Sequence, residues 1–124
     1  MLGIGTDIVE IARIEDVWTR QGLRFAQRVL TDWEMERLRD KKKPHRFLAK
    51  RFAAKEAIAK CFGCGIGTEL GWRDLEIRAS EKGAPVVELS DRAQAFAQRV
   101  GASRVLLSIS DERAYAVAFA ALVP

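Results

Sequence analysis

Residues 51–60, Arg-Phe-Ala-Ala-Lys-Glu-Ala-Ile-Ala-Lys, constrain the fold of this chain more than any other stretch. At about 100° per residue they form a helix with apolar side chains on both sides, Phe52 on one and Ile58 on the other. Such a helix is stable only where other elements cover both sides. We therefore expect a largely buried central helix over residues 45–62, which the glycine loop at residues 63–67 ends.

Glu56 is the unusual residue of this helix, because its helical neighbours are Phe52 and Ala59 rather than open water. A carboxylate in such a place must be protonated, paired or bound to a cation. An ion pair with Lys60, one turn further on, would be the plain structural explanation, worth about 0.3–0.5 kcal/mol. From spacing alone, the structural and the functional interpretation of Glu56 both stay open.

A second candidate acid, Asp7, lies in the first predicted strand, residues 2–10. Gly3 and Gly5 share a face of this strand with Asp7. Glycines weaken a strand unless something must come close to its backbone. We therefore expect Asp7 to project into a space cleared of side chains, with a strand-end residue or a helix N-cap as the alternative.

The remaining pattern predicts short helices before the central one and mostly strands after it. The expected helices cover residues 10–21, 23–30, 31–40 and 91–100, and the expected strands cover residues 75–79, 86–89, 104–110 and 115–123. The last two strands are continuously apolar, which predicts burial on both faces and favours a subunit interface. The fold class is α+β, with helices packed against a small antiparallel sheet, and 124 residues predict one domain over residues 1–124.

The charge of the chain is concentrated between residues 39 and 51. Seven basic residues and one acidic residue give this segment a net charge of +6, against +4 for the whole chain. Such a segment suits phosphates, an acidic protein or nucleic acid, although a solvated linker between helices would look the same. No apolar run is long enough for a membrane span and no secretory signal is visible, so we expect a cytoplasmic protein without a membrane partner.

Two smaller features allow weaker statements. Arginines at positions 13, 20, 24 and 28 recur on the exposed sides of the first two helices and form a possible partner surface. Cys61 and Cys64 form a C-x-x-C that ends a helix, whereas a redox dithiol is normally placed just ahead of one. A zinc site needs four ligands and His45 is the only histidine, so we expect free thiols without a functional role.

Two long motifs together resemble a known family. Residues 3–14, Gly-Ile-Gly-Thr-Asp-Ile-Val-Glu-Ile-Ala-Arg-Ile, and residues 51–60, followed by Gly63-Cys-Gly-Ile66, are similar to holo-(acyl-carrier-protein) synthase. This is the small, single-domain kind of 4′-phosphopantetheinyl transferase. Shorter matches at residues 25–31, 72–77, 83–85 and 108–116 follow in the same order, so that the resemblance covers essentially the whole chain.

The resemblance implies the 4′-phosphopantetheinyl transferase fold and transfer of the phosphopantetheine arm of coenzyme A to a serine of apo acyl carrier protein. The second product would be adenosine 3′,5′-bisphosphate, and the modified carrier would serve fatty acid biosynthesis. The resemblance also implies Mg²⁺ as cofactor and a homotrimer with active sites at the subunit boundaries. It assigns Asp7 and Glu56 to the metal and Lys60 to catalysis.

The same resemblance places further residues around the two substrates. Lys42, Lys43 and Arg51 would contact coenzyme A phosphates, and Gly63, Gly65 and Pro85 would border the cofactor. Arg13, Arg24 and Arg28 would meet the acidic carrier protein. Two positions depart from the usual pattern, Asp111 in place of a histidine and Cys64 in place of a threonine, so contacts of those two side chains cannot be carried over.

The residue types suit this chemistry independently of the resemblance. Mg²⁺ held by one or two carboxylates can neutralise pyrophosphate oxygens, and Lys60 can stabilise charge on the transferring or leaving group. The attacking serine must lose a proton, and Glu56 is the candidate base, directly or through a metal-bound water.

Two other functions are the alternatives. One is a basic binding module for nucleic acid or an acidic protein, which would leave Asp7 unexplained, and the other is a different Mg²⁺-dependent phosphoryl enzyme. No nucleic-acid motif is visible, so we expect no nucleic-acid partner.

Overall fold

A computed structural model describes residues 2–124 of the chain. Its elements follow in the order β1 (Gly3–Glu10), α1 (Ile11–Gln21), α2 (Leu23–Val29), α3 (Asp32–Leu38), α4 (Pro44–Cys61), the 3₁₀ turn η1 (Trp72–Asp74), β2 (Leu75–Ala79), β3 (Pro85–Leu89), α5 (Asp91–Arg99), β4 (Arg104–Asp111) and β5 (Tyr115–Val123). The predicted α+β class is confirmed. The expected single sheet is in fact two, a three-stranded antiparallel sheet in the order β1-β5-β4 and the hairpin β2–β3.

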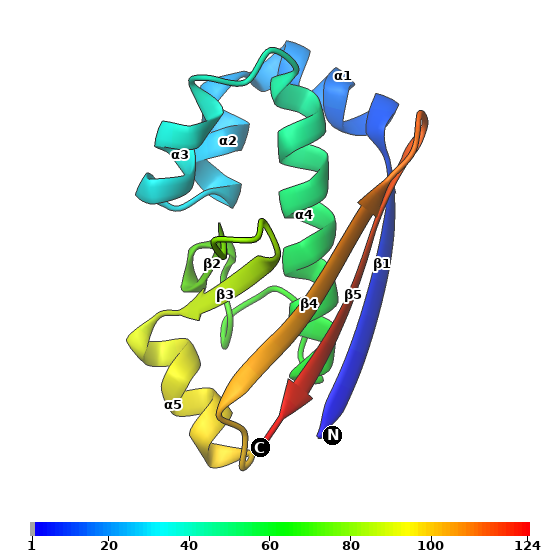
Figure 1. Cartoon of the computed structure of the whole chain (residues 1–124). Coiled ribbons are helices and arrows are strands. Elements are labelled where there is room, and N and C mark those ends of the chain that lie inside the picture. Colours follow the sequence, from blue (N-terminus) through cyan, green and yellow to red (C-terminus); the bar gives the residue numbers. More distant parts are fainter. Residues whose placement is uncertain (1) are drawn as a thin grey trace.

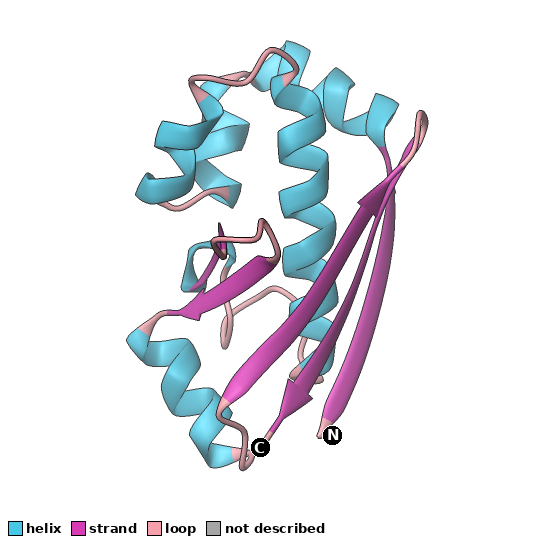
Figure 2. Ribbon diagram, viewed as in Figure 1, coloured by secondary structure: helices cyan, strands magenta, loops and turns pink. Residues whose placement is uncertain are grey.

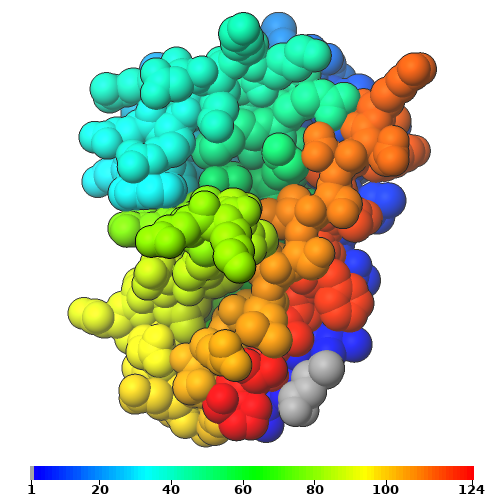
Figure 3. All heavy atoms as spheres, in the orientation of Figure 1, coloured from blue at the N-terminus to red at the C-terminus, as the bar shows by residue number. Residues whose placement is uncertain are grey.

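Helix α4 lies along one face of the three-stranded sheet, and the other elements surround it (Figure 1). Helices α2 and α3 lie beside the N-terminal half of α4, and the β2–β3 hairpin and α5 lie beside its lower half (Figure 2). In the space-filling view the hairpin fills the surface between the α3 side of the molecule and α5 (Figure 3). The expected burial of the central helix is thus observed, with residues 53–55 and 57–59 fully buried.

Strand β5 explains how a helix and a sheet pack so closely. Ala116, Ala118 and Ala120 are fully buried on the side of α4, whereas Val117 and Phe119 point to the opposite face and are exposed. Because the side chains on the inner face are small, the helix can lie close to the strand backbone. Buried alanines alternate with exposed residues along this strand, because successive side chains point to opposite faces of the sheet. The expectation that the strand is buried on both faces is therefore wrong for this part of the single chain.

Two glycines of β1 make the same approach possible at the neighbouring strand. A Cβ atom on Gly3 would lie 2.2 Å from the carbonyl oxygen of Cys61, and one on Gly5 would lie 2.1 Å from the carbonyl oxygen of Ala57. The space that these glycines clear is therefore filled by the backbone of α4. The expectation that the glycines leave open space needs correction, because the face they clear is a helix–strand contact, whereas Asp7, two residues further on, lines an open groove.

The ends of the elements agree with the predictions to within about two residues, and the differences have local causes. Pro44 occupies the first turn of α4, where its missing N–H is not needed, so the helix begins one residue earlier than expected. Gly63 and Gly65 have positive φ angles of 79° and 68° directly after the helix. Within residues 2–124, no helix is long and apolar enough to cross a membrane.

We predict that Gly5→Ala destabilises the protein by about 3 kcal/mol or more, because the new methyl group must displace the α4 backbone. The free energy of unfolding in urea measures this cost. Gly67→Ala is the matched control, since nothing lies within 4 Å of a Cβ there, and it should change stability by less than about 0.5 kcal/mol. Equal stability of the two variants would contradict the close packing of β1 on α4.

Candidate active site

The packing of β1 on α4 brings Asp7 next to the end of the central helix that bears Glu56 and Lys60. The Lys60 ammonium lies 3.2 Å from Oδ1 of Asp7 and donates to the Thr6 carbonyl oxygen at 2.9 Å. Among residues 2–124, Glu56 takes part in no ion pair, so the structural alternative of a Glu56–Lys60 pair is wrong. The lysine is instead shared with the strand.

Glu56 therefore faces a second carboxylate without a direct cationic partner. Its side chain is half-buried, and burial, followed by the negative charge of Asp7, raises its pKa, while Lys60 lowers it in part. The charge of Asp7 thus makes ionisation of Glu56 more difficult. A divalent cation between the two would remove that repulsion.

The donor set at this position fits Mg²⁺. Asp7 and Glu56 supply carboxylate oxygens, the ligands that Mg²⁺ prefers, and Mg²⁺ is commonly bound by one or two carboxylates together with waters and substrate phosphates. In the described part of the chain, no group of three or more His, Cys, Asp or Glu residues could hold a metal ion. The site therefore suits a cation that a phosphorylated substrate helps to bind, rather than a metal held by protein alone.

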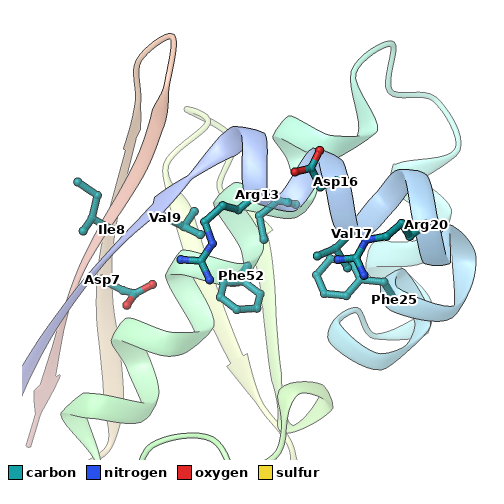
Figure 4. A pocket seen from close by; sticks show the side chains of 10 residues that line it. Asp7, Ile8, Val9, Arg13, Asp16, Val17, Arg20, Phe25 and Phe52 are labelled. Atoms are coloured by element: carbon teal, nitrogen blue, oxygen red, sulfur yellow. The ribbon is translucent and has the colours of Figure 1, made fainter.

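A groove of about 440 Å³ opens beside these carboxylates, between β1, α1, α2 and α4. We call it the α1 groove. Figure 4 shows Arg13 reaching from α1 toward Asp7 and the Phe52 ring, with Arg20 and Phe25 further along the groove. Arg24 and Arg28 lie on the exposed side of α2, where Arg28 donates to Gln21 at 2.6 Å. Of the expected partner residues, the structure thus brings Arg13 to the carboxylates and leaves the other two on the surface nearby.

A second hollow of about 210 Å³ lies between α4, the β2–β3 hairpin and β4. We call it the hairpin cleft. Lys50 and Arg51 form its α4 side, Gly83 and Pro85 its hairpin side and Asp111 its β4 side. Arg51 and Pro85, which are expected to contact one cofactor, therefore line the same cleft.

The other expected cofactor residues lie at two further places. Lys42 and Lys43 line a shallow basic pocket of about 360 Å³ at the start of α4, and Lys50 lines both this pocket and the hairpin cleft. Gly63 and Gly65 lie in the loop after α4, with open space where a Cβ would be. The single chain thus brings the basic residues into two connected hollows and leaves the glycine loop apart from both.

A buried charged cluster behind the hairpin cleft was missed from the sequence. Glu34 and Lys55 are both fully buried, and their charged atoms lie 2.6 Å apart. Glu34 also forms a capping box with Thr31 at the start of α3, and this local pattern gives no sign of its second role. The available signal was Lys55 itself, a charged residue in a helix with apolar residues on both sides, which must have a buried partner.

Asp111, one of the two departures from the usual pattern, has a clear structural partner. Arg46 on α4 lies 3.1 Å from its carboxylate and also donates to the carbonyl oxygens of Glu112 and Arg113, which ties the β4–β5 turn to α4. Near the other departure, burial raises the pKa of the Cys61 thiol to about 11, the opposite of what a reactive thiolate requires. Cys64 is free and exposed.

Comparison with known proteins identifies the class to which this fold and site belong. Residues 3–120 match the model of the 4′-phosphopantetheinyl transferase superfamily. The holo-(acyl-carrier-protein) synthase of Vibrio parahaemolyticus is 51% identical over 118 residues, which cover 95% of this chain and 94% of that sequence. The chain therefore belongs to the 4′-phosphopantetheinyl transferase superfamily and, within it, to the holo-(acyl-carrier-protein) synthases.

Solved structures agree with this family and with the fold. The crystal structure of holo-(acyl-carrier-protein) synthase from Neisseria meningitidis superimposes with a TM-score of 0.95 at 39% identity, over 100% of this chain and 99% of that one. The enzyme from Helicobacter pylori, in complex with coenzyme A, gives a TM-score of 0.84 at 35% identity over 96% and 98% of the two chains. The predicted family and enzyme class are confirmed.

Proposed function

We propose that this chain transfers the 4′-phosphopantetheine group of coenzyme A to a serine of an apo acyl carrier protein and releases adenosine 3′,5′-bisphosphate. The observation that carries the proposal is the meeting of Asp7, Glu56 and Lys60, two carboxylates that share one lysine, at a place where Asp7 lines an open groove. Coenzyme A bound to the Helicobacter pylori relative supports this donor. Residues 1–124 act as one transferase domain in this proposal.

The two basic hollows suit the phosphates of coenzyme A. Lys42 and Lys43 supply a positive pocket on the surface, and Arg51 supplies a planar guanidinium in the hairpin cleft, where it can bind phosphate oxygens in a bidentate manner. Pro85 would form the apolar edge of the same cleft. Gly63 and Gly65, which follow α4 with no side chains to obstruct an approach, would border the pantetheine arm.

The reacting groups are then held at the carboxylate site. The serine hydroxyl of the carrier attacks the pyrophosphate phosphorus that bears the pantetheine arm, and the bond from that phosphorus to adenosine 3′,5′-bisphosphate breaks. Glu56, whose raised pKa makes it a better proton acceptor than an ordinary glutamate, takes the serine proton. Lys60 stabilises the negative charge that develops on the phosphate oxygens.

Asp7 and Glu56 would hold the Mg²⁺ ion that the proposed chemistry requires. When bound, the ion neutralises the pyrophosphate and makes the phosphorus more susceptible to attack. Binding would also free Lys60 from Asp7, so that the ammonium can turn toward the substrate. The role of Glu56 as a base is separable from its role as a ligand, because Glu56→Gln with full turnover at saturating Mg²⁺ would exclude the first.

The α1 groove and the arginines beside it suit an acidic carrier protein. Arg13 on α1 lines the groove near Asp7, and Arg24 and Arg28 lie on the exposed side of α2, whose Phe25 also lines the groove. Positive groups around the rim of a site attract an acidic partner and fix its orientation. A carrier bound there would place its serine at the carboxylates. We place the reaction in the cytoplasm and in the supply of carrier protein for fatty acid biosynthesis.

We further propose a homotrimer, in which the open face of the three-stranded sheet is covered by neighbouring subunits. This face exposes large apolar side chains, Ile4, Ile8, Leu106, Val117 and Phe119, each at least 37% exposed in the single chain. An apolar patch of this kind marks an interaction surface. Light scattering should give a mass three times the chain mass of 13.9 kDa, and a monomer at micromolar concentration would contradict the proposal.

The transfer reaction can be tested by mass spectrometry of the carrier. The chain, coenzyme A, Mg²⁺ and a competent apo carrier should yield a carrier heavier by one phosphopantetheine group. The gain should disappear on removal of Mg²⁺ with a chelator and in Asp7→Ala, which removes a proposed metal ligand. No gain under any condition would contradict the proposed function, and full activity of Asp7→Ala would contradict the site.

The carrier surface makes a separate prediction. Arg24→Glu should raise the KM for the carrier protein about tenfold or more and leave the KM for coenzyme A within about twofold, because the acidic partner meets a reversed charge. Arg99→Glu on α5 is the control, with the same change in charge far from the groove. Equal effects of Arg24→Glu on the two KM values would show that the carrier binds elsewhere.

A further inference from the structure

Glu34 lies at the centre of a buried polar cluster that joins three parts of the fold. Its carboxylate accepts hydrogen bonds from the backbone N–H groups of Thr31 and Ile77, each at 2.9 Å, and from the Lys55 ammonium at 2.6 Å. Lys55 also donates to the carbonyl oxygen of Val29 at 2.7 Å. One carboxylate therefore holds together the start of α3, the strand β2 and the middle of α4.

Arg51 is the second charged partner of Glu34 and the link to the hairpin cleft. Its Nε lies 3.4 Å from Oε2 of Glu34, its Nη2 donates to the carbonyl oxygen of Ile77 at 3.2 Å, and its guanidinium lies 4.4 Å from the centre of the Phe47 ring. Three different contacts thus fix one side chain, of which only 15% stays exposed. The exposed part lines the hairpin cleft.

The charges of this cluster do not balance within the protein. Glu34 supplies one negative charge, whereas Lys55 and Arg51 supply two positive charges. The nearby Glu76 does not change this balance, because it pairs with Arg78 at 2.6 Å. Burial lowers the pKa of Arg51 despite the opposing effect of Glu34, which agrees with this excess of positive charge. An anion in the hairpin cleft would supply the missing charge.

We infer that Glu34 is a positioning residue of the donor site, whose buried carboxylate orients the Arg51 guanidinium toward a phosphate of the donor in the hairpin cleft. The inference rests on the proposed function for the identity of that phosphate. Lys55 has a different part, since it lies behind Glu34, makes its contacts inside the protein and does not line the cleft. Lys55 balances the charge of the carboxylate from inside the protein, whereas the backbone N–H groups of Thr31 and Ile77 fix its position, and the carboxylate keeps Arg51 in place.

Orientation matters for this arginine because its recognition of phosphate is geometric. A guanidinium binds two phosphate oxygens only when they lie near its plane, opposite two of its N–H groups, and a freely rotating side chain must lose that freedom on binding. The contacts with Glu34, Ile77 and Phe47 remove the freedom in advance. Loss of the carboxylate should therefore weaken donor binding and leave the reaction of the bound donor nearly unchanged.

Two variants separate this role from a purely structural one. Glu34→Asp keeps the buried charge but withdraws the carboxylate from Arg51 by one CH₂ group. Glu34→Gln combined with Lys55→Met removes the negative charge together with the lysine charge it balances, so no unpaired lysine is left buried. Lys55→Met alone keeps Glu34 beside Arg51, and Glu36→Gln changes an exposed glutamate of the same helix.

We expect Glu34→Asp and the double variant to raise the KM for coenzyme A about tenfold or more. The kcat at saturating coenzyme A and the KM for the carrier protein should stay within about twofold of the unmodified chain. Lys55→Met and Glu36→Gln should leave all three constants within about threefold. In an Arg51→Ala background, Glu34→Asp should have no further effect on the KM for coenzyme A, because the two residues act as one unit.

Calorimetric titration of coenzyme A into the same proteins gives a readout that does not depend on turnover. The inference is overturned if Glu34→Asp or the double variant folds and its KM for coenzyme A stays near that of the unmodified chain. The inference is also overturned if Glu34→Asp still raises the KM for coenzyme A in the Arg51→Ala background. If the unmodified chain binds coenzyme A but modifies no carrier, the proposed function fails, and weaker binding to Glu34→Asp still supports the inference. Absence of coenzyme A binding to the unmodified chain overturns both.

Discussion

The contact between the backbone of β1 and the backbone of α4 is the constraint on which the rest of the structure depends. It exists because Gly3 and Gly5 have no side chains where the carbonyl oxygens of Cys61 and Ala57 lie. The alanines of β5 continue the same close contact on the next strand. Asp7 follows Gly5 by two residues, on the same face, and so reaches the side of α4 that bears Glu56 and Lys60. A helix held further from the sheet would leave these carboxylates apart.

Helix α4 has two charged regions with different environments. Near its middle, Arg51 and Lys55 share the fully buried Glu34, and this cluster faces the hairpin cleft through Arg51. One turn further on, Glu56 and Lys60 lie at the half-buried site with Asp7, beside the α1 groove. Because one rigid helix supplies both regions, the proposed phosphate site and the proposed site of reaction would keep a fixed separation. This explains why a helix with apolar residues on both sides retains so many charged ones.

Much of this arrangement could be predicted from the sequence, and the failures have physical reasons. The buried central helix, the α+β class and the helix ends follow from local periodicity and from glycine and proline positions. The ion pair of Lys60 with Asp7 could not be predicted, because the two residues lie 53 positions apart and only the fold brings them together. The capping box of Glu34 is a local feature of residues 31–34, but its contacts with Lys55 and Ile77 depend on how α3 and β2 pack. Spacing shows which residues share a face and does not show which element covers it.

In the proposed site, a strand carboxylate and a helix carboxylate meet to hold one divalent cation against the donor pyrophosphate. Crystals grown with coenzyme A and Mn²⁺ in place of Mg²⁺ test it directly, since anomalous scattering locates the manganese. We expect one strong anomalous peak at about 2 Å from carboxylate oxygens of both Asp7 and Glu56. A peak bound only by phosphate oxygens, or placed away from these two side chains, would contradict it.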